Sequence, residues 1–328
     1  MHANAALDPM TIEQACSNDS FERPSFAHVL RDVTAQPSGF TGTLRLDPEH
    51  GFFFDHPLDH VPGSLLLAAV LQLVDIAGGE RELYVSSLAA SFTRFCELDR
   101  PVVIDASPLR RESSDAFSSR CHVRQSGECL GAARVELRRC SGAVTGALQP
   151  RALPPRVDPR LVHRSRLENV LLGAAPANPL TCEILPVGAA HFLAADRGAS
   201  PLYLLEAARQ FCTLLSHRAL DVPLDSQLVL LDIQLCTQLA VKRCEGLSLR
   251  AERCCRDGGS GSPKLCFEVT ISAAEAVVAR VSLEARAFER ATFERIRAKQ
   301  RRSRTAPAAP RQPTRDEVAA SRKSARNS

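Results

Sequence analysis

The sequence predicts an α+β protein in which two antiparallel sheets each wrap around a central, buried helix. Two apolar helical runs, Leu65–Val74 and Tyr203–Cys212, align when Gln72 is laid on Gln210, an offset of 138 residues. Each run is followed by four apolar segments separated by turn signals, and alternation such as that in 133–137 has the period of a half-buried strand. Because a helix that is apolar nearly all round belongs in a core, we expect each sheet to enclose its helix.

The predicted elements repeat in the two halves, with helices expected over 65–74 and 202–214. The expected strands are 83–95, 101–106, 116–123 and 129–137 in the first half, and 228–235, 247–251, 264–271 and 276–287 in the second. We expect the two sheets to join edge to edge, since pairing removes two exposed edges that invite aggregation. Gln72 and Gln210 are expected to bridge the two helices.

Composition divides the chain into five parts. They are a flexible arm (1–22), a first unit (23–140), a Pro-rich linker (141–160), a second unit (161–288) and a basic tail (289–328). The tail has few large apolar residues, so it is expected to be disordered, apart from a helical extension of a turn or two within 292–302.

Charge and composition exclude several function classes. The tail carries 12 Lys/Arg and 4 Asp/Glu, which leaves 29 basic and 33 acidic residues in the body, so the body is acidic. With 5% aromatics and no Trp, a base-stacking nucleic-acid platform is not expected. The longest apolar run, 65–71, is far short of the roughly 20 residues that span a bilayer. No secretory signal is visible, so we expect a cytoplasmic protein.

Cysteine usage points to packing rather than to chemistry. The chain has 12 Cys and no CxxC pair. Without a signal peptide, a disulfide framework is not expected, and reduced cysteine packs as a small hydrophobe. We therefore expect no metal and no cofactor.

The densest polar motif is Phe52–Gly63, which leads directly into the first helix. Two histidines and two aspartates fall within six residues, 55–60. Unpaired N–H groups and the dipole at a helix start favour negative charge, so the N–H groups of Gly63 and Ser64 are candidates to hold a thioester oxyanion. The alternative is a polar loop with two satisfied histidines.

Several segments carry a family resemblance. Phe54-Asp-His-Pro-Leu-Asp-His-Val-Pro-Gly-Ser-Leu-Leu-Leu67 resembles the signature of the A-factor biosynthesis hotdog family. The segments 161–170, 204–210, 91–95 and 97–99 are similar to further motifs of that family. The resemblance covers about residues 25–288. It implies a tandem double hotdog that forms a pseudo-dimer within one chain, which leaves further association open.

The resemblance also implies an activity and partners. The family's enzymes are acyltransferases that move a β-ketoacyl group from acyl carrier protein to dihydroxyacetone phosphate in γ-butyrolactone signal synthesis. Related hotdog dehydratases share a histidine of one unit and a helix acid of the other at one site. By that comparison, His56 and Glu206 form one complete site, whereas Ala68 and the altered loop 191–200 form a defunct one.

Roles follow for the remaining candidates. Glu206 is the candidate base, with its pKa raised by apolar surroundings, or else a carboxylate paired with Arg209. His56, favoured over His60, polarises reactants, and Asp59 orients an imidazole or caps the turn. Arg94 and Arg164 rank first for binding phosphate, ahead of the other candidates His163, Arg197 and Arg209.

Two other functions remain open. One is a thioesterase or dehydratase on the same scaffold, which differs only in the acceptor, because a fold does not fix chemistry. The other is a non-catalytic acyl-binding protein, which Ala68 and the altered second loop favour.

Overall fold

The computed structural model describes residues 29–79, 83–139, 143–144, 153–174, 178–194, 200–238, 240–241, 246–258, 262–274 and 276–305. The expected arm and the end of the tail, residues 306–328, lie outside this part of the chain. So do residues 141–142 and 145–152 of the linker.

The elements follow one plan twice. The first unit contains β1 (Leu30–Gln36), β2 (Gly39–Leu44), α2 (Gly63–Gly78), β3 (Leu83–Phe92), β4 (Val102–Ala106), β5 (Arg110–Arg111), β6 (Ala116–Gln125) and β7 (Glu128–Arg139). The second contains the 3-10 helices η1 (Pro159–Val162) and η2 (Leu167–Asn169), then β9 (Thr181–Glu183), α3 (Pro201–Arg218), β10 (Gln227–Thr237), β12 (Leu247–Arg256), β13 (Lys264–Ala273) and β14 (Ala276–Phe288). The helix α4 (Arg290–Thr305) follows, and β8 (Ala143–Val144) pairs with β11 (Ala240–Val241).

The two halves share one 12-stranded sheet, with eleven strands in the order β1-β2-β4-β6-β7-β3-β10-β14-β13-β12-β9 and the short β5 paired with β6 off this path. The order reads outward from the seam between β3 and β10 in the same way on both sides. At this seam the strands are antiparallel, and Leu88 lies opposite Leu235. The expected edge-to-edge junction is therefore confirmed, as is the expectation of antiparallel strands around a central helix in each half.

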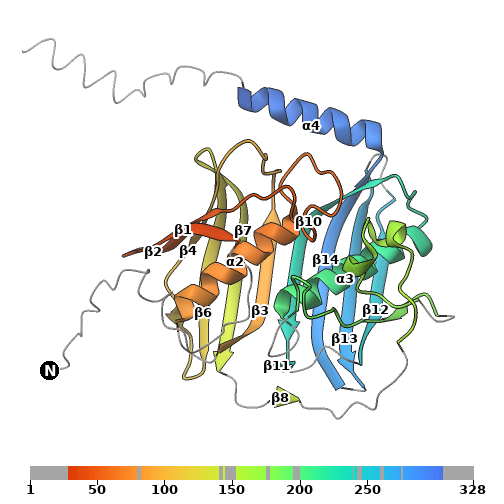
Figure 1. Ribbon diagram of the computed structural model, residues 1–328, viewed down its shortest axis with the longest axis horizontal. Coiled ribbons are helices and arrows are strands. Elements are labelled where there is room, and N and C mark those ends of the chain that lie inside the picture. The colour runs from red at the N-terminus through yellow and green to blue at the C-terminus, as the bar shows by residue number, and fades with distance from the viewer. Residues whose placement is uncertain are drawn as a thin grey trace, which may run out of the picture.

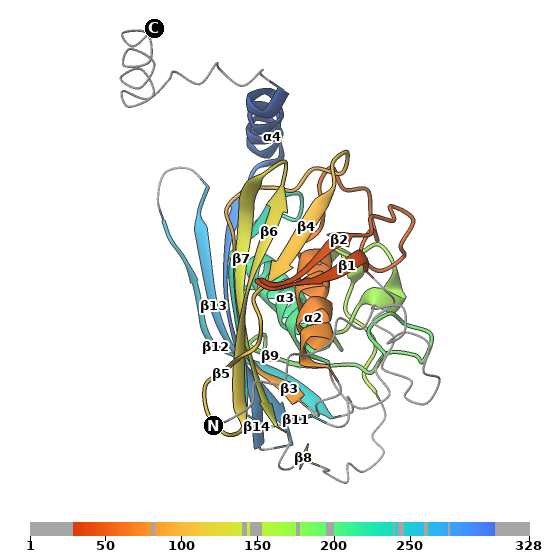
Figure 2. The same cartoon turned by 90° about the vertical axis from the view of Figure 1, so that its left-hand side faces the viewer.

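The helices α2 and α3 lie side by side on one face of the sheet (Figure 1). Seen from the side, they lie between the sheet and the loops of 153–194 (Figure 2). Both start at sequence signals: Pro62 precedes α2, and the Ser200 hydroxyl accepts a hydrogen bond from the N–H of Tyr203 in α3. The helix α2 is followed by Gly79, whose backbone has φ 63° and ψ −142°, a positive-φ conformation that favours glycine. None of the helices in the described ranges is both long and apolar enough to cross a membrane.

Gln72 and Gln210 have equivalent roles that differ from the one expected. The side-chain oxygen of Gln72 accepts a hydrogen bond from the N–H of Leu30 at 3.1 Å, and that of Gln210 accepts one from Leu171 at 2.8 Å. Each residue thus ties its helix to an earlier segment of its own unit. The expected bridge between the helices is wrong, because each amide satisfies a buried backbone group nearby.

The tail prediction needs correction. Residues 290–305 form the helix α4, which is longer than the expected turn or two. Its side chains Phe293 and Arg297 are buried. The composition gave the wrong expectation because it counts apolar residues, whereas this helix is held chiefly by Arg297, which binds the buried carboxylate of Glu97 and the exposed one of Asp59.

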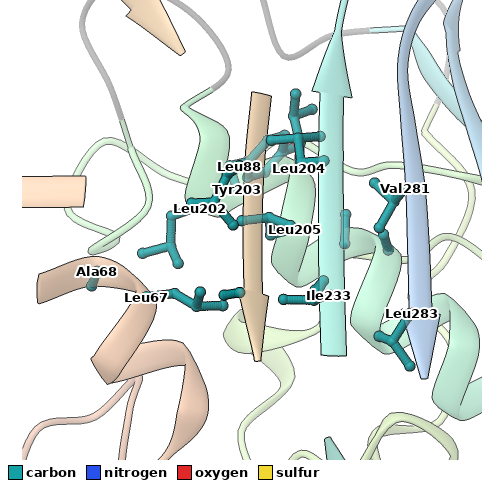
Figure 3. Close-up of a cluster of buried hydrophobic side chains, with 14 of the residues drawn as sticks. Leu67, Ala68, Leu88, Leu202, Tyr203, Leu204, Leu205, Ile233, Val281 and Leu283 are labelled. Atoms are coloured by element: carbon teal, nitrogen blue, oxygen red, sulfur yellow. The ribbon is translucent and has the colours of Figure 1, made fainter. Parts of the chain in front are cut away.

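The core is continuous across the seam, which generates a stability prediction. Leu88 of β3 and Ile233 of β10 lie with Leu67 of α2 and the first turn of α3 in one apolar cluster (Figure 3). Leu88 is fully buried, so Leu88→Ala should cost about 2–5 kcal/mol, the usual range for such a cavity. Because the units share a sheet and a core, both should still unfold in one transition, as followed by urea denaturation. Leu224→Ala, at an exposed site, is the control; two separate transitions in the Leu88 variant would contradict this view.

Candidate functional site

The predicted site lies where the motif loop of the first unit meets the second unit. Asp55, whose side chain is fully buried, accepts hydrogen bonds from the N–H groups of Ser165 (2.7 Å) and Arg166 (3.0 Å). It also accepts one from the side-chain amide of Asn169 at 2.9 Å. Asp55 therefore fixes the loop that carries His56 against the opening segment of the second unit, a role that sequence analysis missed.

Glu206 lies at the centre of a buried ion-pair network. Its Oε1 accepts from Nη2 of Arg164 at 2.6 Å and from Nη2 of Arg209 at 2.7 Å, while Oε2 accepts from Nε of Arg209 at 2.8 Å. The amide of Gln210 donates a further hydrogen bond to Oε1. Burial alone would raise the pKa of Glu206, but the two guanidinium groups outweigh it and hold the pKa well below its ordinary value. The expected raised pKa is wrong, and the alternative pairing with Arg209 is what the structure has.

Arg164 is committed to this network rather than open to a ligand. Its side chain is buried, and its Nη1 donates to the backbone oxygen of Phe52 at 2.7 Å. The guanidinium also lies 4.8 Å from the centre of the Phe52 ring. Nε is buried without a hydrogen-bond partner in the described part of the chain. The expectation that Arg164 binds phosphate does not fit this environment, because its outer nitrogens are used within the protein.

Arg209 has the more open position. Its side chain is 26% exposed and uses Nε and Nη2 on Glu206, which leaves Nη1 without a partner among the described residues. Arg94, by contrast, pairs with Glu128 at 2.8 Å on the surface. No contact within the described ranges links Arg94 to the His56 loop. Arg197 lies outside the described residues.

His56 is half-buried and lies within electrostatic reach of the network. Burial lowers the pKa of His56, and the positive charges of Arg164 and Arg209 lower it further, against a smaller opposing effect of Asp55. Its ring makes no hydrogen bond to any described residue. The arginines that surround Glu206 therefore also influence His56, which joins the two predicted halves of the site through their charges.

Two further histidines of the second unit lie beside this group. Nε2 of His163 and Nε2 of His217 are 2.9 Å apart, and Nδ1 of His217 donates to the backbone oxygen of Val222 at 2.8 Å. Since Nδ1 of a neutral His217 carries the proton, its Nε2 accepts from His163. Burial, with smaller effects of His217, Arg209 and His56, lowers the pKa of His163 to about 3.

The other motif residues face the C-terminal helix. Asp59 and His60 form a hydrogen bond of 2.7 Å, and Arg297 of α4 binds Asp59. Gly63 and Ser64 occupy the first turn of α2, where no side chain caps the helix, and their N–H groups have no acceptor among the described residues. These donors point out of a helix start, as the oxyanion expectation requires.

The loop before α3 has a different use. Phe192 stacks on Phe52 with ring centres 5.4 Å apart, and His191 donates through Nε2 to the side-chain oxygen of Asn169 at 3.0 Å. Ala68 is fully buried. Residues 195–199 lie outside the described part, so the pairing of Ala68 with the loop 191–200 stays a prediction. Within the described ranges, no group of three His, Cys, Asp or Glu side chains is placed to hold a metal ion.

Comparison with known families accounts for this arrangement. The model of the A-factor biosynthesis hotdog domain matches residues 23–141 and 147–289. The chain belongs to this family. The first unit, the second unit and the His56 loop all lie within the match, while α4 begins one residue after it ends.

Individual relatives are similar over shorter stretches. The chain is 41% identical over 66 residues to a 2-oxo-3-(phosphooxy)propyl 3-oxoalkanoate synthase of Streptomyces virginiae, covering 20% of this chain and 22% of that protein. It is 32% identical over 103 residues to the synthase of the same name from Streptomyces griseus, covering 31% and 34%. The alignments thus span a fifth to a third of these relatives. A crystal structure described as a thioesterase from Novosphingobium aromaticivorans shares the fold, with a TM-score of 0.51 and 14% identity over 79% of this chain and 98% of that one.

The buried histidine gives a pH prediction. With a pKa of about 3 in the folded protein and about 6.5 when unfolded, His163 takes up its proton more readily in the unfolded state between these values. Its contribution to stability is therefore complete above pH 6.5 and is lost as the pH falls, by about 1.4 kcal/mol per pH unit. The free energy of unfolding in urea, measured from pH 7.5 to 4.5, should fall less steeply in His163→Gln. The matched variant His122→Gln, on β6, should keep the wild-type slope; an unchanged slope in His163→Gln would refute the assignment.

Proposed function

We propose that the protein transfers a 3-oxoacyl group from an acyl carrier protein thioester to the hydroxyl of dihydroxyacetone phosphate. The name of the Streptomyces relatives denotes the ester that this reaction forms. The observation that carries the proposal is the imidazole of His56, which makes no hydrogen bond to a described residue and whose pKa is lowered by burial and by the charges of Arg164 and the ion-paired Arg209 of the other unit. A base and a phosphate-binding cation are the two groups that this acceptor requires.

His56 serves as the general base. Its lowered pKa keeps the imidazole neutral at pH 7, and a neutral ring is able to take a proton. The acceptor oxygen attacks the thioester carbon while His56 takes the hydroxyl proton. The C–S bond then breaks, and the departing thiolate takes that proton from His56. The products are an ester and the carrier's free thiol, so the protons balance.

The oxyanion and the phosphate are held by different elements. The N–H groups of Gly63 and Ser64 at the start of α2 stabilise the charge on the thioester oxygen. Arg209 holds the phosphate through its outer edge. The Glu206 charge raises the pKa of Arg209, so that the guanidinium stays positive. Glu206 is thus a positioning residue for two arginines, and Asp59 and His60 support the loop that carries His56.

His56→Ala should lower the rate of acyl transfer by about 10²-fold or more, the usual effect of losing an acid–base group. The assay follows β-ketoacyl carrier protein and dihydroxyacetone phosphate by mass spectrometry.

Arg209→Lys keeps the positive charge but loses the bidentate hydrogen bonding of the guanidinium, so it should mainly raise the KM for dihydroxyacetone phosphate. The control is His122→Gln. Glu206→Gln should lower the rate of transfer by a factor similar to that in His56→Ala and destabilise the fold, since it leaves two cations partly unpaired. The double variant of Glu206→Gln and His56→Ala should then be little slower than either single variant.

The same assay separates the other functions. Free β-keto acid without ester, at a rate independent of dihydroxyacetone phosphate, would indicate a thioesterase. An α,β-unsaturated acyl product from a 3-hydroxyacyl thioester would indicate a dehydratase. Binding of acyl carrier protein without any product would indicate a non-catalytic acyl-binding protein. Each of these results would overturn the proposal.

The exposed face of α4 is proposed to bind the carrier protein. Arg295, Lys299 and Arg302 are exposed there, and the carrier presents an acidic surface. Replacing all three by Glu should weaken carrier binding by 10-fold or more at low salt and flatten its salt dependence, as measured by calorimetry. Arg110→Glu, an exposed arginine on β5, is the control. If the triple variant binds the carrier as the wild type does, the docking site lies elsewhere.

A further inference from the structure

The helix α4 lies beyond the segments that match the family model, yet it contacts the motif loop of the first unit. The match ends at residue 289, and α4 starts at Arg290. Both views place this helix at one end of the sheet, across the ends of the strands (Figures 1 and 2). Hydrogen bonds join Arg297 of α4 to Asp59 of the motif loop, 238 residues earlier in the sequence.

Arg297 makes most of these contacts. Its side chain is 3% exposed. Nη1 and Nη2 donate to the two carboxylate oxygens of Glu97 at 2.9 and 2.8 Å, and Nε donates to Oδ2 of Asp59 at 3.0 Å. Nη2 also donates to the backbone oxygen of Asp59 at 2.9 Å. The guanidinium lies 4.7 Å from the centre of the Phe95 ring. All three nitrogens of the guanidinium are thus used.

The hydrogen bonds that Asp59 accepts from α4 determine which of its carboxylate oxygens is open to His60. Arg297 and Arg301 both bind Oδ2 of Asp59, so that Oδ1 remains for the His60 ring, whose Nδ1 lies 2.7 Å away. The hydrogen bond of His60 and the positive charge of Arg297 lower the pKa of Asp59, against its partial burial, so the carboxylate is ionised. An ionised carboxylate only accepts hydrogen bonds, and Nδ1 of His60 must therefore carry the proton.

Packing fixes the plane of the same ring. The centre of the His60 ring lies 4.7 Å from that of Phe95, and Phe293 of α4 lies 6.3 Å away. Nε2 of His60 makes no hydrogen bond to a described residue. An imidazole held at Nδ1 by a carboxylate, with Nε2 open, is the arrangement that presents a histidine for proton transfer. His60 follows His56 by four residues in the same loop, directly before α2.

We propose that Arg297 is a positioning residue that, through Asp59, fixes the tautomer and orientation of His60 beside the His56 site. The helix α4 is then an addition to the family domain that completes the first unit's loop. The catalytic part of this inference rests on the proposed acyl transfer, whereas its structural part does not. The two are tested by separate measurements on the full-length chain.

The tautomer is read by ¹⁵N NMR of histidine-labelled protein near pH 8, with the His60 signals assigned by their loss in His60→Gln. In the wild type, the proton should lie on Nδ1. Arg297→Gln and Asp59→Asn should both shift the His60 nitrogens to a mixture of tautomers, and Arg297→Lys should restore the wild-type pattern in part. Glu294→Gln, on the exposed side of α4, is the control and should change nothing.

Activity gives the second readout. In Arg297→Gln, kcat for acyl transfer should fall by about 10-fold with little change in KM, because bound substrate meets a misoriented ring. An unchanged His60 tautomer in Arg297→Gln would overturn the inference whatever the activity. If that variant fails to fold, Arg297→Lys decides, and a fully wild-type tautomer together with unchanged kcat in it would overturn the inference too. A wild-type protein with the Nδ1–H tautomer but no transferase activity would instead refute only the proposed function.

Discussion

Arg164 carries a positive charge into the interior between the two units, and the protein is organised to compensate for it. Its guanidinium binds the backbone of Phe52 in the first unit and the carboxylate of Glu206 in the second. Asp55 lies 4.0 Å away. Breaking a buried pair by removing one partner costs about 3–5 kcal/mol, because the remaining charge has no water to solvate it. The loop before α2, the opening of the second unit and α3 are therefore held in one relative arrangement.

This constraint decides which groups are available for chemistry. Because Glu206 is bound by two guanidinium groups, its affinity for protons is too low for a base. Burial, together with the same two cations, lowers the pKa of His56, which leaves a neutral imidazole at the place where we propose a base. In the proposed reaction, the second unit contributes positive charge and the first contributes the proton acceptor. The asymmetry between the units, visible in the sequence as one intact and one altered loop, would then be an electrostatic division of roles.

Apolar runs and alternation in the sequence correctly predicted the helices and strands that form by burying one face. The two central helices and eight of the strands that follow them in the two units are predicted by apolar runs and alternation, since burial of one face imposes that period. The strand β1 is mostly exposed, β2 is half-buried without regular alternation, and neither was predicted. The environment of Glu206 depends on Arg164, 42 residues earlier, and that of Asp59 on Arg297, 238 residues later. Hydrophobic periodicity carries no information about such long-range pairs. The roles predicted for Glu206 as a base and for Arg164 as a phosphate ligand were therefore wrong.

The loop before α3 shows how a duplicated unit is used when its motif differs. Phe192 packs between Phe52 and Phe53 of the first unit, and Asn169 links His191 to Asp55 by accepting a hydrogen bond on its oxygen and donating through its nitrogen. Burial, followed by the charge of Arg164, lowers the pKa of His191, which therefore remains a neutral donor. The Phe192 contacts are made directly with the segment that carries His56, and the His191 contact reaches Asp55 of that segment through Asn169. The altered loop is thus a support for the intact one, and substitutions in it would act on the His56 site through packing rather than through chemistry of their own.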